Sequence, residues 1–304
     1  MLYDLNLAWS PATTADRLLQ TLSLAHSLGY ATVALNHTLE APYPANPTSP
    51  FPPRPEASPS GSKLPHVLHR ATLPVSDPAA SSYRLHALAN VYDIIAVRPL
   101  TEQAFQNACL TLDVPIISLD LTTQFPFHFR PKPCMAAVSR GVRFEICYGQ
   151  LLAADGRGRA NFIGNVTNLF RTTRGRGFII SSEAKAAIGL RGPADVVNML
   201  SVWGLTNEKG IEGFRSTPRS VVVNEGIKRN GFRGVVRIVQ TATREESGAA
   251  AGASTEVSQA SQNTSTTKVA QSHKRKKGEN DGGQLLSKPR AKKTKLAAAP
   301  VADT

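Results

Sequence analysis

Short, almost continuously apolar segments recur along this chain, separated by segments of helical length. The clearest are VYDIIAV at 91–97 and PIISLDL at 115–121. Strands of this composition are buried on both faces, as in a parallel sheet that is covered by helices. The alternation predicts an α/β fold of seven strands, and its length favours a closed or nearly closed (β/α) barrel over an open sheet. The other five strands are predicted at 2–7, 31–36, 66–73, 142–148 and 178–182.

Helical patterns occupy the intervals between most of these strands. In residues 14–28, Leu18 and Leu22 belong to one apolar stripe, and Gly29 follows as a stop signal. Thr101 is placed to cap a helix that begins directly after it. Further helices are predicted at 79–90, 160–171, 193–203 and 207–229, the last of them broken near Pro218.

Composition divides the chain into a folded part and a tail. We expect residues 1–244 to form the barrel, interrupted at 41–65, where nine prolines in 25 positions predict a flexible insertion. Residues 245–304 are poor in large apolar side chains, so we expect a disordered basic tail. Two basic clusters in it have the pattern of a bipartite nuclear localisation signal, although a tail that contacts RNA or is simply solvated is compatible with the same residues. The clusters comprise Lys274, Arg275, Lys276, Lys277, Lys288, Arg290, Lys292, Lys293 and Lys295.

Positive charge is concentrated in the second half of the predicted barrel. Residues 1–125 carry a net charge of −3, whereas residues 126–244 carry +12, and 15 of the 19 cations in that half are arginines. A planar guanidinium binds phosphate through two hydrogen bonds, so this surplus points to a polyanion, with nucleic acid as the default. A merely soluble basic surface is the alternative.

The candidate RNA-binding residues come from this arginine-rich half. RTTRGRG at 171–177 follows a predicted helix, and its glycines allow the backbone to approach phosphate closely. Any one of the cations is more readily explained by exposure or a salt bridge than by RNA binding, so the prediction concerns the set. Aromatic residues make up only 6% of the chain, which disfavours a base-stacking platform and favours recognition of the backbone and shape of folded RNA. The set is Arg130, Lys132, Arg140, Arg157, Arg159, Arg171, Arg174, Arg176 and Arg191.

Residues suited to metal-dependent catalysis are sparse. Of the seven histidines, only His37 follows a predicted strand at a position that suits a barrel active site. The chain contains no GxSxG nucleophile elbow and no P-loop. Its three cysteines lack the paired spacing of a metal site and are interpreted as core residues of a protein from a reducing compartment. We therefore expect no cofactor and no metal, and no run of apolar residues is long enough to predict a membrane span.

Four segments resemble a known family in their order and spacing. They are similar to the TIM-barrel-like protein subunit, of about thirty kilodaltons, of archaeal and eukaryotic ribonuclease P and of RNase MRP. The likeness covers nearly all of residues 1–225 except the proline-rich insertion. The segments are GYATVALNHTLE at 29–40, YDIIAVRPLTEQAFQNACLTLDVPIISLD at 92–120, RGVRFEICY at 140–148, and the run from FIISSEA to LRGPADVVNM at 178–199.

This resemblance implies a noncatalytic, RNA-binding protein of an RNA-based enzyme. Ribonuclease P removes 5′ leaders from precursor tRNA through an active site in its RNA, and RNase MRP processes precursor rRNA. The implied partners are the catalytic RNA, precursor tRNA and a small ferredoxin-like protein subunit. The implied location is the nucleus, including the nucleolus.

A more distant resemblance links the chain to the polymerase-and-histidinol-phosphatase superfamily of metal-dependent phosphoesterases. Where that superfamily begins with Asp-x-His-x-His, this chain reads DLNLA at 4–8, so both histidines are absent. Its Asp-His motif is half kept as NH at 36–37, and a late motif appears as SEAK at 182–185 without its last ligand. Alanine cannot bind a metal, and an amide binds transition metals poorly. We therefore interpret four positions as a vestigial metal site: Asp4, Asn6, His37 and Glu183.

Two other functions compete with the ribonucleoprotein subunit. A stand-alone metal-dependent phosphoesterase would require bound zinc or manganese, with His37 as a necessary ligand. A basic adaptor would bind RNA only through residues 245–304, so deletion of that segment would abolish RNA binding.

Overall fold

The computed structural model describes residues 1–40, 43, 46–53, 63–77, 85–232 and 236–237, and the structural statements below concern these residues. The predicted tail at 245–304, with its nuclear localisation signal, lies outside them. So do the first half of the helix predicted at 79–90 and parts of the insertion at 41–65.

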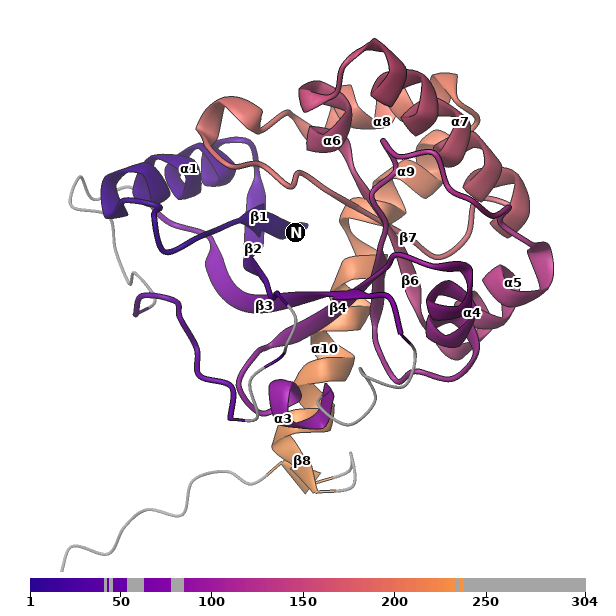
Figure 1. Ribbon diagram of the computed structural model, residues 1–304. Helices are drawn as coiled ribbons and strands as arrows, with labels where there is room; N and C mark the ends of the chain where they lie inside the picture. Colours follow the sequence, from indigo (N-terminus) through magenta and orange to yellow (C-terminus); the bar gives the residue numbers. More distant parts are fainter. Residues whose placement is uncertain (41–42, 44–45, 54–62, 78–84, 233–235, 238–304) are drawn as a thin grey trace, which may run out of the picture. The chain divides into compact units, whose positions relative to one another are not determined.

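Seven parallel strands form one sheet in sequence order, as the apolar segments predicted (Figure 1). The fifth strand is shorter than the predicted 115–121, because the chain turns after it: Asp120 Oδ1 accepts hydrogen bonds from the backbone N–H and the hydroxyl of Thr122. The strands are β1 (Leu2–Ala8), β2 (Tyr30–Thr38), β3 (His66–Val75), β4 (Ile94–Pro99), β5 (Ile116–Ser118), β6 (Arg143–Cys147) and β7 (Phe178–Ser181).

The sheet closes into a near-barrel where the chain leaves β7 and meets the end of β1. Glu183 N donates to Asn6 O at 2.7 Å, and Ala8 N donates to Ala184 O at 3.1 Å. Elsewhere along this seam, α9 (Asn207–Phe214) and α10 (Ser216–Asn230) pack against both β1 and β7 in place of an eighth strand. The barrel therefore has seven strands and a partly helical seam.

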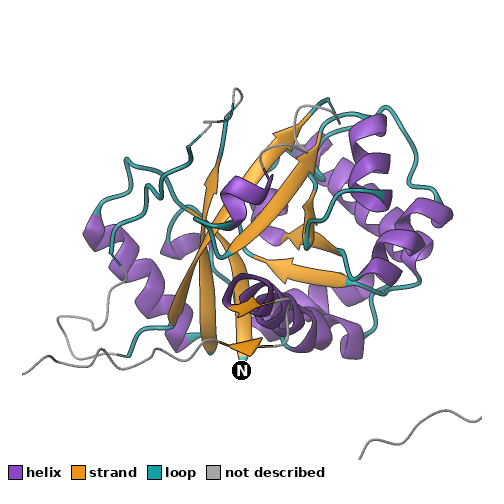
Figure 2. Cartoon of the chain, turned by 90° about the horizontal axis from the view of Figure 1, so that it is seen from below, coloured by secondary structure: helices purple, strands orange, loops and turns teal. Residues whose placement is uncertain are grey.

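Helices surround the strands, as seen from below in Figure 2. Thr101 caps its helix as predicted, accepting from Ala104 N at 3.2 Å. The helix predicted at 207–229 is broken near Pro218, as predicted: α9 ends before Arg215, and Pro218 lies in the first turn of α10, where no backbone N–H is needed. The remaining helices are α1 (Ala15–Ser27), α3 (Leu85–Ala89), α4 (Glu102–Leu110), α5 (Pro131–Arg140), α6 (Tyr148–Ala153), α7 (Gly156–Thr173) and α8 (Pro193–Val202), with a 3₁₀ turn η1 (Ala187–Gly189) and a hairpin of β8 (Gly231–Phe232) and β9 (Val236–Arg237).

Two helices, α5 and α6, were not predicted. The sequence at the start of α5 is PKP, which suggests a loop when read alone. Both prolines fall in the first helical turn, where the missing N–H groups have no helical partner to lose. Gly141 ends the helix in the left-handed conformation, with φ of 89°.

The insertion predicted at 41–65 is anchored to the barrel at two described residues. Phe51 stacks on the ring of His69 with centroids 4.4 Å apart and also packs against Trp9 at 4.8 Å. Tyr43 is buried, and its hydroxyl donates to the carbonyl of Pro74. These aromatic residues tie the proline-rich segment to the outer face of the sheet near β1 and β3.

The barrel interior has an apolar layer and a polar layer. Side chains two residues apart on a strand share a face. On β2, Ala34 is followed by Asn36, and on β7, Ile179 is followed by Ser181. The apolar layer lies in the amino half of the strands and includes Val221 of α10, whereas polar residues occupy the carboxyl half. The carboxyl ends of the strands are the usual place for a functional site in such barrels.

The outer core lies between the sheet and the helices and contains two of the three cysteines. Cys109, Cys134 and Cys147 are all buried and free, which confirms their interpretation as core residues.

Within the described part of the chain, no helix combines the length and apolar character needed to cross a membrane.

Candidate functional site

A buried ion pair occupies the centre of the polar layer. Arg70 on β3 and Glu145 on β6 are joined at two points, Nη1 to Oε1 at 2.5 Å and Nη2 to Oε2 at 2.7 Å, and both side chains are 0% exposed. Nη1 also donates to Leu5 O at 2.7 Å. Paired hydrogen bonds of this kind are the geometry that best offsets the desolvation of two buried charges.

Neutral side chains close a hydrogen-bonded ring around this pair. Thr72 Oγ1 donates to Asn36 Oδ1 at 2.7 Å, and Asn36 Nδ2 donates to Asn6 Oδ1 at 2.8 Å. Asn6 Nδ2 then donates to Glu145 Oε2 at 3.2 Å, and Ser181 Oγ donates to Oε1 at 2.8 Å. Both the oxygen and the nitrogen of the Asn6 amide therefore make hydrogen bonds within the protein.

The ion pair governs the protonation of both partners. Burial alone would raise the pKa of Glu145, but the charge and hydrogen bonds of Arg70, with hydrogen bonds from Ser118 and Ser181, hold it at about 2. Burial disfavours the charged form of Arg70, yet Glu145 keeps the pKa of Arg70 above its ordinary value. The centre of the barrel therefore holds an ionised pair at neutral pH.

A second ion pair lies nearer to solvent. Arg98 Nη2 contacts Glu183 Oε1 at 2.8 Å, with side chains 17% and 19% exposed. Gln150 Nε2 donates to the other oxygen of Glu183 at 2.7 Å. Glu183 has a φ of 53°, a left-handed conformation that is uncommon for residues other than glycine. The turn after β7 thus directs this carboxylate towards β4 and α6.

The side chains at the four positions interpreted as a vestigial metal site do not converge on one point. Asn6 belongs to the ring around Glu145, and Glu183 pairs with Arg98. The His37 ring packs edge-on against Trp9 with centroids 6.0 Å apart, and burial lowers its pKa. Among the residues that the structure describes, no group of three or more His, Cys, Asp or Glu side chains could hold a metal ion.

Asp4 stabilises the seam between β1 and β7. Its Oδ1 accepts from Ser182 N at 3.0 Å and from Asn6 N at 3.2 Å, at an irregularity in the pairing of β1 with β2. Its Oδ2 is buried without a hydrogen-bond partner among the described residues. Burial, with a smaller contribution from Glu145, raises the pKa of Asp4 to about 6. The ionised form of Asp4 therefore destabilises the fold relative to the protonated form.

Replacing Asp4 by an asparagine should change how stability depends on pH. Because the folded pKa of about 6 lies above the ordinary value of 3.8, wild-type stability should fall as pH rises through this interval, by about 2–3 kcal/mol. The amide of the Asp4→Asn variant cannot ionise. The stability of the variant relative to wild type should therefore increase by that amount between pH 4 and pH 7. Urea unfolding at several pH values measures the difference. A difference that is independent of pH would show that Asp4 does not titrate in this range.

Five arginines of the predicted RNA-binding set lie along α7 and the turn that follows it. All five are exposed, and none has an ion-pair partner within the described residues. An α-helix rises 1.5 Å per residue, so the Cα atoms of Arg157 and Arg171, near the two ends of α7, are about 21 Å apart. This strip, which we call the α7 arginine strip, comprises Arg157, Arg159, Arg171, Arg174 and Arg176.

The other predicted cations divide between structural and surface positions. Arg140 donates to Cys109 O at 2.8 Å and to Leu112 O at 2.7 Å, which completes the carboxyl end of α4. Arg191 donates to Ile188 O at 2.6 Å and to Leu190 O at 2.7 Å. Arg130 lies 3.5 Å from Glu102, whereas Lys132 is exposed in the first turn of α5. The α7 arginine strip and Lys132 are therefore the part of the set that is exposed and has no ion-pair partner among the described residues.

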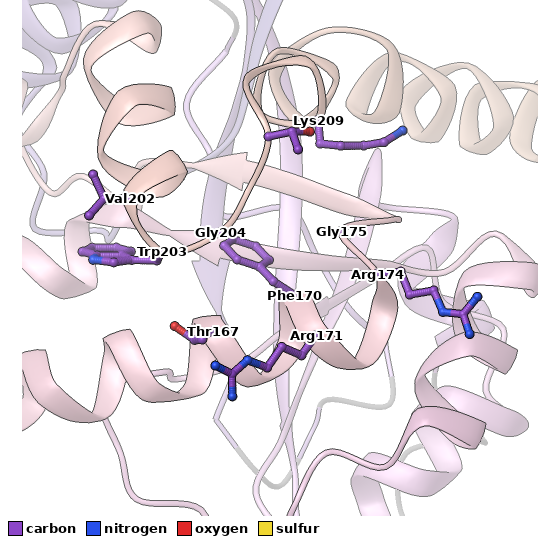
Figure 3. A pocket seen from close by; sticks show the side chains of 10 residues that line it. Thr167, Phe170, Arg171, Arg174, Gly175, Val202, Trp203, Gly204 and Lys209 are labelled. Atoms are coloured by element: carbon purple, nitrogen blue, oxygen red, sulfur yellow. The ribbon is translucent and has the colours of Figure 1, made fainter.

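Arg171 and Arg174 also line a pocket of about 640 Å³ between the end of α7 and the start of α9 (Figure 3). Two of its other lining residues, Trp203 and Lys209, were not among the sequence candidates. Trp203 was interpreted only as the end of a helix. Nothing in the local sequence places it beside residues 171–174, so only the packing of α8 against α7 could have identified it.

The buried ion pair was also missed, although the sequence carried a signal for it. Arg70 and Glu145 each interrupt an apolar segment that alternation predicts to be a buried strand. A buried charge needs a partner of opposite sign, so each of these residues predicts a buried ion pair, although the sequence alone does not say which partners meet.

Comparisons with known proteins agree with this geometry. The family model described as RNase P subunit p30 matches residues 1–230. The chain is 30% identical over 237 residues to the probable ribonuclease P protein subunit 3 of Schizosaccharomyces pombe, covering 78% of this chain and 98% of that protein. It is 32% identical over 229 residues to the ribonuclease P protein subunit p30 of Mus musculus, covering 71% and 83%.

Two further comparisons concern a yeast relative and the fold. The ribonuclease P/MRP protein subunit RPP1 of Saccharomyces cerevisiae is 26% identical over 249 residues, covering 77% of this chain and 83% of that protein. A chain in the cryo-EM structure of archaeal ribonuclease P with mature tRNA superposes with a TM-score of 0.56 and 16% identity, covering 80% of this chain and all of that one. This structural likeness confirms the barrel fold. Together with the family model and its relatives, the sequence shows that the chain belongs to the RNase P subunit p30 family.

Proposed function

We propose that this chain is a noncatalytic RNA-binding protein subunit of the ribonuclease P ribonucleoprotein, which removes the 5′ leader from precursor tRNA. We further propose that RNase MRP, which processes precursor rRNA, shares it. The observation that carries the proposal is the α7 arginine strip in a member of this family, because five exposed guanidinium groups without carboxylate partners among the described residues are available to bind phosphate.

The barrel centre supports a binding role over a phosphoesterase role. In a metal-dependent hydrolase of this architecture, the carboxyl ends of the strands would present several neutral histidines and carboxylates to metal ions. Here Arg70 and Glu145 neutralise each other at the centre, and Arg98 and Glu183 do so nearer to solvent. The carboxylates of Glu145 and Glu183 are both ion-paired with guanidinium groups, so neither is available as a metal ligand.

The partners follow from the same proposal. The α7 arginine strip binds the catalytic RNA or precursor tRNA, and a small ferredoxin-like protein subunit binds elsewhere on the barrel. The tail at 245–304 directs the protein to the nucleus, including the nucleolus, through its two basic clusters. Deleting the tail should weaken nuclear import while RNA binding by the barrel persists.

Sequencing the RNA that co-purifies with the tagged full-length protein tests the proposal. We expect the catalytic RNAs of ribonuclease P and of RNase MRP to be strongly enriched, and we expect the purified complex to cleave precursor tRNA at the 5′ leader. The tail-deleted chain, expressed in the same cells, serves as the control for binding through residues 245–304 alone. Immunoprecipitates that contain no such RNA and leave precursor tRNA intact would refute the proposal.

A further inference from the structure

The pocket at the end of α7 combines cations with an aromatic ring. In Figure 3, Arg171 lies on the side of Phe170 that faces Trp203, whereas Arg174 and Lys209 lie on the other side. Lys209 contacts Glu212 at 2.9 Å, but Arg171 and Arg174 have no carboxylate partner in the described part of the chain. Positive charge therefore flanks an apolar centre on both sides.

The backbone at Arg174 adopts a conformation that favours glycine over arginine. Arg174 follows the last turn of α7 with φ of 56° and ψ of 38°, in the left-handed region. Glycine and asparagine suit this position best, and a residue such as arginine is strained there. Only Arg174 and Glu183 among the described non-glycine residues have a positive φ. Strained residues that persist in a structure cluster at binding sites.

Trp203 supplies an aromatic ring on which a nucleic-acid base can stack. It is half-buried at the end of α8, and its ring packs edge-on against Phe162 with centroids 6.1 Å apart, which holds it in place. The adjacent Gly204 has a φ of 101° and open space where a Cβ would stand, so the chain beside the ring is not crowded. An indole of this kind can stack on any nucleic-acid base. The pocket volume of about 640 Å³ is within the range of small-ligand sites.

We propose that this pocket binds one unpaired nucleotide of an RNA strand. The base stacks on Trp203, and the phosphates on either side of it bind Arg171 and Arg174, with Lys209 beside the latter. The inference rests on the proposed function, because the strand belongs to the RNA of the complex. It goes beyond recognition of backbone and shape, because it requires a base turned out of its stack.

Tryptophan fluorescence of the full chain tests the stacking directly. The chain contains two tryptophans, Trp9 in the core and Trp203 in the pocket, so Trp9→Phe leaves Trp203 as the sole reporter. A short single-stranded oligouridylate should quench its emission. A strand of the same length in which every nucleotide is abasic should bind the chain about tenfold more weakly, and Trp203→Leu should remove that preference. Equal affinity of the wild-type chain for both strands would overturn the inference.

Arg174→Gly separates binding from folding. Glycine relieves the left-handed backbone, so Tm should stay equal to that of wild type or rise, whereas affinity for the oligouridylate should fall about fivefold to tenfold at 0.1 M salt. Arg17→Ala, which removes an exposed cation of α1, is the matched charge control and should leave affinity almost unchanged. If Trp203 is not quenched while filter binding still shows salt-dependent RNA affinity, the pocket inference fails and the proposed function stands. If the chain captures no RNA by either measurement, both fail.

Discussion

Replacing Arg70 by Met is expected to lower the free energy of unfolding by about 3–5 kcal/mol, because it leaves Glu145 charged, buried and without its partner. Both side chains are 0% exposed, so no rotamer can return the carboxylate to water without opening the barrel. Urea unfolding followed by circular dichroism measures the loss. A barrel of marginal stability would be largely unfolded by such a change.

A double variant distinguishes loss of the ion pair from loss of packing. Arg70→Met with Glu145→Gln removes both charges, and the new amide can still accept from Ser181 or Asn6. We expect it to recover all but about 1–2 kcal/mol of the single-variant loss, the remainder reflecting the lost donor to Leu5 O. If the double variant is as unstable as the single one, packing rather than charge accounts for the effect.

The pH dependence should also reverse in the single variant. In the wild type, the pKa of Glu145 is lowered to about 2. The ionised carboxylate therefore contributes fully to the free energy of unfolding above its ordinary pKa, and this contribution is lost as pH falls through 2. Without Arg70, burial raises the pKa of Glu145 instead, so Arg70→Met should become less stable as pH rises from 5 to 8. An unchanged pH profile would mean that Glu145 finds another cation.

Replacing Arg171, Arg174 and Arg176 together by Ala should weaken RNA binding by about 100-fold at 0.1 M salt and reduce the salt slope by up to about three. The three side chains are exposed at the end of α7, so little stability should be lost. Filter binding at several salt concentrations, with the RNA that co-purifies with the protein, measures both quantities.

A charge-matched variant serves as the control for this loss. Arg17, Arg215 and Arg219 are also exposed, and replacing them by Ala removes the same charge from other parts of the surface. That variant should keep most of the affinity and of the slope, because general attraction falls off over about 10 Å at this salt concentration. If the two triple variants behave alike, net charge rather than the α7 arginine strip determines binding.

Much of the fold could be predicted from local patterns. Each strand is a short apolar segment, and the stop and cap signals at Gly29 and Thr101 act within a few residues, so both can be recognised in sequence. The first turn of α5 was misread for a related reason, since Pro131 and Pro133 mark loops as often as helix starts.

The candidate site was predictable only as a set of cations. Arg140 and Arg176 look alike in sequence, but one is bound to the carbonyls at the end of α4 and the other is exposed without an ion-pair partner among the described residues. The difference depends on how α5 lies against α4. Trp203 likewise becomes part of a pocket only because α8 returns beside α7.

Local sequence was sufficient for the order of the strands and of most helices and for the one-sided positive charge, because period, capping and composition act over a few residues. The closed barrel decided which charges are neutralised and which remain available. Arg70 and Glu145 are 75 positions apart, and Asp4 and Ser182 are 178 apart. Such pairs form only when seven strands curve until the first meets the turn after the last, so their chemistry is a property of the barrel and cannot be read from any single segment.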